Sequence, residues 1–549
     1  MLITALLFSL LYLSAQTYEW AWATRAGGTI WDNGNDIVAD NDGNTYVTGH
    51  FNGTATFGSI TLTSDGNDED VFAAKIDSDG DFVWAVRAGG THADYGYGIA
   101  IDAVSNVYLI GQYRGTATFG ATTLLSDEDH SEVFVAKIAR NGSFVWAIRA
   151  GGTSDDSGRN IALDGLGNIY IYGTFAGTAT FGFNTINSNG WHNIFVAKLS
   201  PAGSFLWAVA GGAIVQDYTY AHGLALDDAA NIYISGTFSG TALFGTSTII
   251  SSGGGDIFAA KLDSGGNFLW AVKAGGVDWD YGNDIAVDNS SNAYLIGYFE
   301  STATFGSTVY TSYGENDIFV TKLDSLGNFL WTVRAGGPYI NLGYSICVDD
   351  SANAYLTGGF YGTVDFGFNQ VNSLGWADIF VAKLDSGGNF LWAVQAGGAD
   401  NNDVGYAIAL DSCANVYLTG FFYESVDFGS HSITSSNESC DIFVAKFSSG
   451  IVATDDETAP GLEGLSRLYD AYPNPLHAGN TAAIKTYIAD RESGILSFYN
   501  LRGQLIANHK LSSGTHEISF NTKGLASGVY FFRLKTASGS SVKKLLLLK

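Results

Sequence analysis

The chain has few of the residues that cross-link a fold or interrupt its secondary structure. Among 549 residues there are three cysteines, five prolines and one methionine. Cys347, Cys413 and Cys440 are too few, and odd in number, for a disulfide framework or a cysteine-ligated zinc site. Charged residues make up only 15% of the chain and aromatic residues 14%, a composition that argues against disorder. Glycine is abundant at 70 residues, which favours many short strands joined by tight turns.

Basic residues are also scarce. The formal net charge is −28, and no basic stripe is present that would attract DNA or RNA, so we expect no nucleic-acid partner. The acidic excess is uneven. Residues 1–465 hold 15 Lys and Arg against 50 Asp and Glu, whereas residues 466–549 hold 11 against 4. This reversal of charge predicts a domain boundary.

Long apolar runs are missing except at the start of the chain. Residues 2–13 are almost wholly apolar and are followed by the small residues Ser14 and Ala15. This predicts a secretory signal peptide over residues 1–15. The alternative is a membrane anchor, but the run is short for a bilayer span. No other segment is apolar enough to cross a membrane, so we expect no transmembrane segment.

A repeat of about 61 residues occupies most of the chain. A tryptophan that precedes Ala-Gly-Gly recurs at spacings of 61 to 63 residues, and three further motifs recur in fixed order between its copies. The tryptophans are residues 22, 84, 146, 207, 270, 331 and 392. The Asp of Asp-x-x-x-Asn-x-Tyr is residue 40, 102, 164, 227, 288, 349 and 411. The Phe of a Phe-Gly pair is residue 57, 119, 181, 244, 305, 366 and 428, and a strand-like DIFVAKLD motif places Lys at 75, 137, 198, 261, 322, 383 and 446.

Each repeat contains four candidate strands. One copy reads as strands over 284–288, 292–299, 317–323 and 328–334, rich in β-branched and aromatic residues with no helical period. Four antiparallel strands repeated radially form a propeller blade. The chain starts with a lone fourth strand, Glu19–Gly28, and its last repeat ends with Asp441–Phe447. We therefore predict an all-β, seven-bladed β-propeller of four-stranded blades, closed by the N-terminal strand, which covers the open edge.

The recurring residues are best interpreted as architecture, because every blade solves the same packing problem. The tryptophans are expected to pack between blades, the Asp and Asn residues to cap the first hairpin turn, and the Lys residues to pair with those Asp residues. This strand order also places Cys413 and Cys440 at opposite ends of one blade, about 23 Å apart. A disulfide needs Cα atoms within about 7 Å, so we predict free thiols.

The repeat resembles a known family. The pattern G-x-x-I-x-x-D-x-x-x-N-x-Y-x-x-G, followed by F-G and then D-x-F-V-A-K-L-D, resembles the SBBP (seven-bladed β-propeller) repeat of bacterial secreted proteins. The resemblance covers about residues 19–448. It implies a scaffold with no fixed catalytic residues.

The last part of the chain is expected to form a second domain. Residues 450–465 are acidic and aperiodic, which is typical of a linker. Residues 466–549 contain alternating runs that predict a small β-sandwich of about 80 residues. We thus predict a signal peptide at 1–15, a propeller at 16–449, a linker at 450–465 and a C-terminal domain at 466–549.

This C-terminal domain resembles the type A sorting domain of the type IX secretion system of Bacteroidota. The residues that carry the match are Tyr472 to Pro475 (with Pro473 and Asn474), Tyr499 to Gln504 (with Gly503), Gly524 to Tyr530 (with Gly528), Lys543, Lys544 and Lys549. The resemblance implies that the type IX machinery is a partner through residues 466–549. It also implies export through the outer membrane, followed by release or attachment to the cell surface. The alternative is an adhesive immunoglobulin-like module.

No catalytic motif emerges from the sequence. The nine histidines form no metal-ligating spacing, and there is no G-x-S-x-G elbow. A pair of carboxylates acting as in a glycosidase stays open, because separation across a cleft cannot be read from sequence. The best binding candidates are aromatics and carboxylates in the variable loops of one propeller face. They are Trp31, Trp191, Trp279, Trp376, Tyr95, Tyr339, Asp94 and Asp280; the alternative is that they form turns.

Calcium is the one candidate cofactor. Oxygen ligands for Ca²⁺ are clustered at Asp65, Asp68 and Asp70 and at Asp127 and Asp129. The alternative is a pair of solvated acidic loops, since neither cluster has the twelve-residue EF-hand pattern.

The functional hypothesis is a non-enzymatic secreted or surface scaffold that binds a glycan or a protein through one loop face. Two alternatives remain at this stage. One is an extracellular hydrolase or lyase that uses carboxylates on that face, and the other is a purely structural surface protein. A fold alone does not decide between them.

Overall fold

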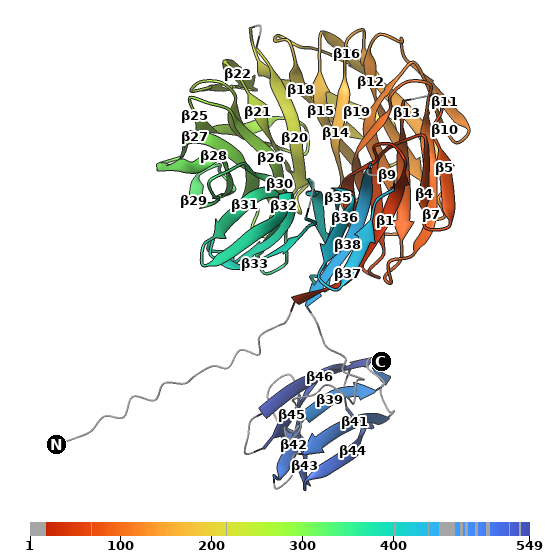
Figure 1. Cartoon of the computed structure of the whole chain (residues 1–549), viewed down its shortest axis with the longest axis vertical. Helices are drawn as coiled ribbons and strands as arrows, with labels where there is room; N and C mark the ends of the chain where they lie inside the picture. Colours follow the sequence, from red (N-terminus) through yellow and green to blue (C-terminus); the bar gives the residue numbers. More distant parts are fainter. Residues whose placement is uncertain are drawn as a thin grey trace, which may run out of the picture. The chain divides into compact units, whose positions relative to one another are not determined.

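The computed structural model is all-β in the part of the chain that it describes (Figure 1). That part comprises residues 18–449 without 67, 216, 400–401 and 437–438, together with 467–472, 476–477, 481–488, 492–500, 505–525, 527–536 and 540–548. The predicted signal peptide and linker lie outside it. Contacts divide the chain into one unit that ends at Ile451 and another that begins at Val452. Within the described ranges, no helix has the length and apolarity that a membrane span needs.

Each repeat contributes a set of four antiparallel strands, as in β-propellers. The two middle strands are almost completely buried, which explains why both their faces are apolar. The sets in chain order are β2 (Asn33–Ala39), β3 (Thr45–Asn52), β6 (Glu69–Ile76) and β7 (Phe82–Gly90); β8 (Tyr95–Ile101), β9 (Val107–Arg114), β12 (Ser131–Ile138) and β13 (Phe144–Gly152); β14 (Ser157–Leu163), β15 (Ile169–Phe175), β18 (Asn193–Leu199) and β19 (Phe205–Ala213); β20 (Thr219–Leu226), β21 (Ile232–Phe238), β24 (Asp256–Leu262) and β25 (Phe268–Gly276); β26 (Asp280–Val287), β27 (Ala293–Phe305), β28 (Thr308–Leu323) and β29 (Phe329–Ala335); β30 (Asn341–Val348), β31 (Ala354–Phe366), β32 (Asn369–Leu384) and β33 (Phe390–Ala396); β34 (Val404–Leu410), β35 (Val416–Tyr423), β38 (Cys440–Ser449) and β1 (Tyr18–Gly28).

Each repeat also contains a hairpin that the sequence analysis did not predict. The Phe-Gly segment between the second and third strands forms an outer hairpin, which pairs with the fourth strand of the preceding set. The separate hairpins are β4 (Thr54–Phe57) with β5 (Ile60–Thr63), β10 (Thr116–Phe119) with β11 (Thr122–Leu125), β16 (Thr178–Phe181) with β17 (Asn184–Asn187), β22 (Thr241–Phe244) with β23 (Ser247–Ile250), and β36 (Ser425–Phe428) with β37 (His431–Thr434). In β27 with β28 and in β31 with β32 the hairpin continues the long strands.

This pairing explains the recurring Gly-Gly. A Cβ atom added to Gly90 would lie 1.7 Å from the Thr116 carbonyl oxygen, and one added to Gly28 would lie 2.0 Å from that of Thr54. Real Cβ contacts are never this close, so the outer hairpin can approach only a fourth strand that ends in glycine.

The predicted pairing of the two ends of the repeat region is observed. Strand β1 pairs antiparallel with β38, with Trp22 opposite Lys446 and Arg25 opposite Phe443, and its other edge pairs with β4 (Figure 1). The first strand of each set contacts the first strand of the next set, and β34 contacts β2. The hydrophobic clusters likewise combine neighbouring sheets: one joins Tyr46 and Val71 to Val107 and Leu109.

The recurring polar residues take the roles that the sequence predicts. Asp288 accepts hydrogen bonds from the backbone N–H and side chain of Asn292, and the Lys322 ammonium lies 3.1 Å from its carboxylate. Five of the seven predicted Lys–Asp pairs are formed: Lys137–Asp102, Lys198–Asp164, Lys261–Asp227, Lys322–Asp288 and Lys383–Asp349. The Trp270 indole N–H donates to the Ser325 carbonyl of the next set, 3.1 Å away, so the tryptophans join neighbouring sets. The three cysteines are free thiols, as predicted.

The C-terminal unit contains two sheets around one core. One sheet has the order β39 (Arg467–Tyr472), β41 (Thr481–Ile488) and β44 (Gly514–Asn521). The other has the order β40 (Leu476–His477), β46 (Ser540–Leu548), β45 (Gly528–Lys535), β42 (Gly494–Asn500) and β43 (Leu505–Leu511). Ile484 and Phe520 of the first sheet share a cluster with Phe498 and Phe532 of the second. Of the predicted sorting residues, Gly528 begins β45 and Tyr530 is buried in it; Pro473, Asn474, Pro475, Gly503 and Lys549 lie outside the described residues.

Candidate functional site

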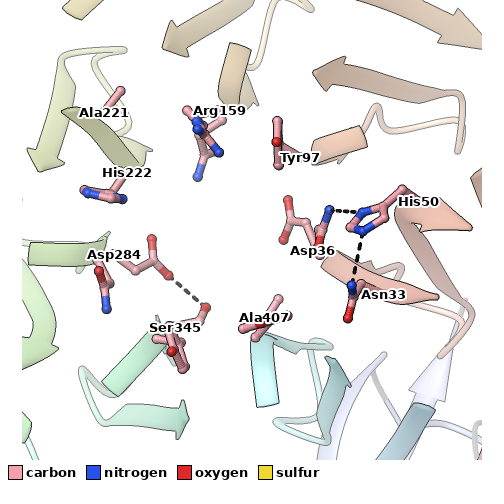
Figure 2. Close-up of a pocket in the computed structure, with 15 residues that line it drawn as sticks. Asn33, Asp36, His50, Tyr97, Arg159, Ala221, His222, Asp284, Ser345 and Ala407 are labelled. Carbon is pink, nitrogen blue, oxygen red and sulfur yellow. Dashed lines mark hydrogen bonds between the residues drawn. The ribbon is translucent and has the colours of Figure 1, made fainter. Parts of the chain in front are cut away.

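A pocket of about 340 Å³ is lined by residues from the first strand of every set (Figure 2). We call it the axial pocket. Its lining consists of Asn33, Asn35, Asp36, His50, Tyr97, Arg159, Asn160, Ala221, His222, Asn283, Asp284, Tyr344, Ser345, Tyr406 and Ala407. Except for His50, all of these residues belong to β2, β8, β14, β20, β26, β30 and β34. Most of them lie in the middle of those strands.

A β-bulge in each first strand supplies the most prominent part of this lining. The register against the second strand shifts at the same place in all seven strands, for example between Gly34 and Asp36 and between Gly158 and Asn160. A bulge leaves one residue unpaired and re-aims its side chain. The seven bulge residues are Asn35, Tyr97, Arg159, His222, Asn283, Tyr344 and Tyr406. They are three tyrosines, two asparagines, one arginine and one histidine, although the residues around them recur.

In two sets the side chain of the residue after the bulge links its first strand to the next first strand. The two Asp36 oxygens accept hydrogen bonds from the N–H groups of Ile37 and Ile99, each 2.8 Å away. Asp284 bonds in the same way to Ile285, and across to the Ser345 hydroxyl and Ile346 N–H. Burial raises the pKa of Asp36 to about 7 and that of Asp284 to about 6. All four carboxylate oxygens accept hydrogen bonds, so these two side chains connect neighbouring first strands.

Arg159 carries a positive charge into the axial pocket. Figure 2 shows Arg159 and Tyr97 pointing into the cavity from adjacent strands. The guanidinium carbon lies 4.3 Å from the centre of the Tyr97 ring, a distance at which a cation–π interaction is favourable. None of the ion pairs formed within the described ranges includes Arg159.

Two histidines in the wall are neutral near pH 7. Burial, followed by the charge of Arg159, lowers the pKa of His222 to about 4, and its Nε2 atom is buried without a hydrogen-bond partner. Burial also lowers the pKa of His50 to about 4. His50 contacts the side-chain amides of Asn33 and Asn35 at 3.1 and 3.2 Å. The wall therefore combines one cation with neutral imidazole and amide groups and with the two hydrogen-bonded carboxyl groups of Asp36 and Asp284.

A second pocket of about 260 Å³ adjoins the axial pocket and shares Arg159 with it. We call it the side pocket. It is lined by Gln112, Arg114, Ser131, Asp155, Ser157, Arg159, Thr174, His192 and Tyr220. Asp155 accepts hydrogen bonds from the backbone and hydroxyl of Ser131 and lies 3.7 Å from Arg114. The buried Ser157 hydroxyl oxygen has no hydrogen-bond partner. The two linings that share Arg159 thus contain hydroxyl, amide and carboxylate groups.

None of the predicted loop aromatics lines either pocket. Tyr95 lies nearest, since its ring stacks on Tyr97 at 5.9 Å and meets His50 edge-on at 4.8 Å. Trp279 is stacked between Tyr218 and Tyr281, at 5.6 and 5.8 Å. The remaining four are exposed: Trp31, Trp191, Tyr339 and Trp376.

The prediction that Asp94 and Asp280 contact a ligand was wrong. Both side chains are completely buried. Asp94 accepts hydrogen bonds from the N–H groups of Gly90 and Arg114, and Asp280 accepts one from Gly276 at 2.6 Å. They hold the turn after Gly-Gly, which is the turn-forming role that the sequence analysis left open.

Among the described residues, no group of three or more His, Cys, Asp or Glu side chains could hold a metal ion, which gives the calcium candidates no support. Asp65 and Asp70 instead share Arg87, at 2.9 and 2.6 Å. Asp127 contacts His130 at 3.2 Å. Asp68 and Asp129 join no such group.

Sequence reasoning missed the bulge residues, although a signal was present. In the motif G-x-x-I, which is A-x-x-L in the fourth copy, the two middle positions read Asn-Asp, Tyr-Gly, Arg-Asn, His-Gly, Asn-Asp, Tyr-Ser and Tyr-Ala. Variation inside an otherwise regular strand marks positions that packing does not dictate.

Two family models match the chain. Residues 145–174 match a β-propeller repeat (SBBP), and residues 470–548 match a secretion system C-terminal sorting domain, the type IX sorting tail. The second match implies export by type IX secretion to the cell surface or the medium.

Individual relatives are distant. An uncharacterized WD repeat-containing protein of Acanthamoeba polyphaga mimivirus is 24% identical over 507 residues, which cover 74% of this chain and 36% of that protein. The chain therefore spans about a third of that relative's length. Among solved structures, a fungal alcohol oxidase of the AA5 family in complex with copper is 11% identical with a TM-score of 0.39, covering 96% of this chain and 100% of that one. YCF48 bound to D1 peptide is 9% identical with a TM-score of 0.38, covering 80% and 99%. Such scores establish no shared activity.

Proposed function

We propose that this chain is a secreted seven-bladed β-propeller, closed by its N-terminal strand, that binds a saccharide at the axial pocket without transforming it. The sorting-domain match supports export. The propeller reading is supported by the seven sets of strands, by the contact of β34 with β2 and by the pairing of β1 with β38. Residues 1–15 act as the signal peptide, and residues 466–549 engage the type IX machinery.

One observation carries the binding proposal: seven bulge residues that face one pocket differ in chemistry, while the strands that present them are alike. If the pocket were packing alone, each repeat would use the same side chain there. Asparagine amides and tyrosine hydroxyls in the lining suit a ligand rich in hydroxyl groups, and the tyrosine rings offer apolar faces.

A non-enzymatic role is supported by the hydrogen bonds that the pocket carboxylates form. General acid–base catalysis needs a carboxyl group that can reach the reacting atoms. Asp36 and Asp284 instead direct their oxygens at backbone and hydroxyl donors of the strands.

The test is a glycan array probed with the purified protein and with two variants. Tyr97→Ala should lose saccharide binding, because it removes a ring and a hydroxyl from the axial pocket. Trp376→Ala, which removes an exposed ring outside both pockets, should bind like the parent. Equal loss in both variants would contradict the axial pocket as the site. Hydrolysis of a bound glycan would favour the enzyme alternative, and neither binding nor turnover would leave the purely structural one.

A further inference from the structure

Arg159 stands where the axial pocket meets the side pocket, and it lines both. Among the described residues of the repeat region, most arginines and many lysines form an ion pair with a carboxylate, as Arg87 does with Asp70. Arg159 instead contacts the Tyr97 ring. A half-buried guanidinium is thereby held in one place with its charge unneutralised.

Each of the two pockets that share Arg159 is lined by a residue with a buried polar atom that has no hydrogen-bond partner. One is Nε2 of His222, which lines the axial pocket, and the other is the hydroxyl oxygen of Ser157, which lines the side pocket. A buried polar atom without a hydrogen bond destabilises the folded state. A bound group with hydrogen-bonding oxygens would remove that destabilisation, so both atoms point independently to a ligand.

We propose that Arg159, His222 and Ser157 form a subsite for the carboxylate of an acidic sugar, whose ring occupies the axial pocket. This inference rests on the proposed saccharide function and names its ligand class. The planar guanidinium fork matches the two oxygens of a carboxylate. The neutral His222 imidazole and the Ser157 hydroxyl each have a proton to donate to such an oxygen. Asn35 and Asn283, at other bulges of the same pocket, are placed for the sugar hydroxyls.

The negative charges nearby restrict the form of this ligand. Asp36 and Asp284 face the axial pocket, and both oxygens of each accept hydrogen bonds from the protein. In the side pocket, one oxygen of Asp155 accepts hydrogen bonds from Ser131 and lies 3.7 Å from Arg114. The chain as a whole has a net charge of −28, which repels a polyanion within about 8 Å of the surface at physiological salt. These charges favour a single uronate residue in an otherwise neutral glycan over a polyuronate chain.

An NMR titration of the full chain tests the proposal with small probes: glucuronic acid, its uncharged methyl ester, glucose and N-acetylglycine. The parent protein should bind glucuronate at least tenfold more tightly than the methyl ester. Arg159→Gln should remove this preference, so that both probes bind with similar weak affinity. The matched control is Arg140→Gln, because Arg140 is exposed in a hairpin turn outside both pockets. It removes the same charge and should leave the preference intact.

The comparison of glucuronate with its methyl ester needs no variant, so a folding defect in Arg159→Gln leaves the test in force. Equal binding of acid, ester and glucose would overturn the carboxylate subsite and leave the proposed saccharide function standing. N-acetylglycine binding as tightly as glucuronate would overturn the sugar as the source of the carboxylate. Absence of binding by every probe, together with a blank glycan array, would overturn the subsite and the proposed function alike.

Discussion

Arg25 and Asp441 lie 416 residues apart in the chain, yet their Nη1 and Oδ2 atoms are 2.6 Å apart. Arg25 belongs to β1 and Asp441 to β38, the first and last strands of the repeat region. The pair repeats a contact found within single repeats, where Arg87 meets Asp70 at the same distance. Strand β1 therefore takes the position of the fourth strand in the seventh set, although it precedes all the other strands in the chain.

Deletion of residues 19–28 should unfold or open the repeat region. The deletion exposes the edges of β38 and β4, which β1 covers on its two sides, and unpaired edges favour aggregation. We expect a lower melting temperature and oligomers in size-exclusion chromatography. A truncated protein that melts like the full chain would contradict this role for β1.

A single substitution tests the contact between β1 and β38 without removing the strand. Arg25→Gln should lower the free energy of unfolding by about 2 kcal/mol. This lies between the losses expected for exposed and for buried ion pairs, because Arg25 is partly exposed whereas Asp441 is buried. Arg87→Gln breaks the equivalent pair inside one repeat and is the control. Similar losses in denaturant unfolding are expected. A loss confined to Arg87→Gln would mean that the β1 contact adds nothing in solution.

The stability of the protein should rise as pH falls from 8 to 6.5. Burial is the largest cause that raises the pKa of five equivalent carboxyls, to about 7 or 8: Asp32, Asp94, Asp156, Asp280 and Asp403. The folded state then binds more protons than the unfolded state, in which the pKa is near 4, so the free energy of unfolding decreases as pH increases through this window.

Two buried histidines limit how far this rise in stability continues as the pH falls. His50 and His222 have pKa values lowered to about 4, so their contribution is lost as pH falls below about 6.5, the ordinary histidine value. Denaturant unfolding at pH 8, 7 and 6.5 measures the effect. The variant Asp94→Asn should show a weaker dependence than the parent. A flat profile over this range, or one of opposite sign, would refute the burial argument.

Gly98→Ala should destabilise the protein by about 1–3 kcal/mol through overpacking. A Cβ atom at Gly98 would lie 2.9 Å from Ile110 Cγ2 and 3.1 Å from Arg159 O and Asn160 Cα, in the next first strand. The control is Gly165→Ala, because a Cβ atom there meets nothing within 4 Å; its effect should stay within about 0.5 kcal/mol. Equal unfolding curves for the two variants would show that the first strands are not closely packed.

Lys322→Met should cost about 3 kcal/mol, because it removes the cation from a buried ion pair and leaves Asp288 without it. Lys75 occupies the same repeat position, contacts the Tyr46 ring at 5.2 Å, and is in no ion pair among the described residues. Lys75→Met should therefore cost about 1 kcal/mol or less. Chemical denaturation measures both, and a larger loss for Lys75→Met would contradict the assignment.

The recurrence of motifs made much of the architecture predictable. Trp22 without a preceding repeat, and Asp441–Phe447 without a following tryptophan strand, were enough to predict which strands pair. The Lys–Asp pairs and the free thiols followed from the same strand order. The outer hairpins were missed, because TATFG and the residues after it are short segments whose partner lies in another repeat. Asp94 and Asp280 were misjudged because a turn-forming carboxylate and a ligand-binding one look the same in a loop sequence.

By itself the sequence determined the all-β class, the repeat, the export signal and the strand that joins the two ends. These follow from local patterns, since each repeat carries the same alternation of apolar residues and the same turn chemistry. Only the tertiary structure decided which variable positions meet. Arg159 and His222 are 63 residues apart, and they share one pocket because a bulge turns each side chain inward while adjacent first strands pack together. The chemistry of that pocket depends on the seven strands converging, which no single repeat encodes.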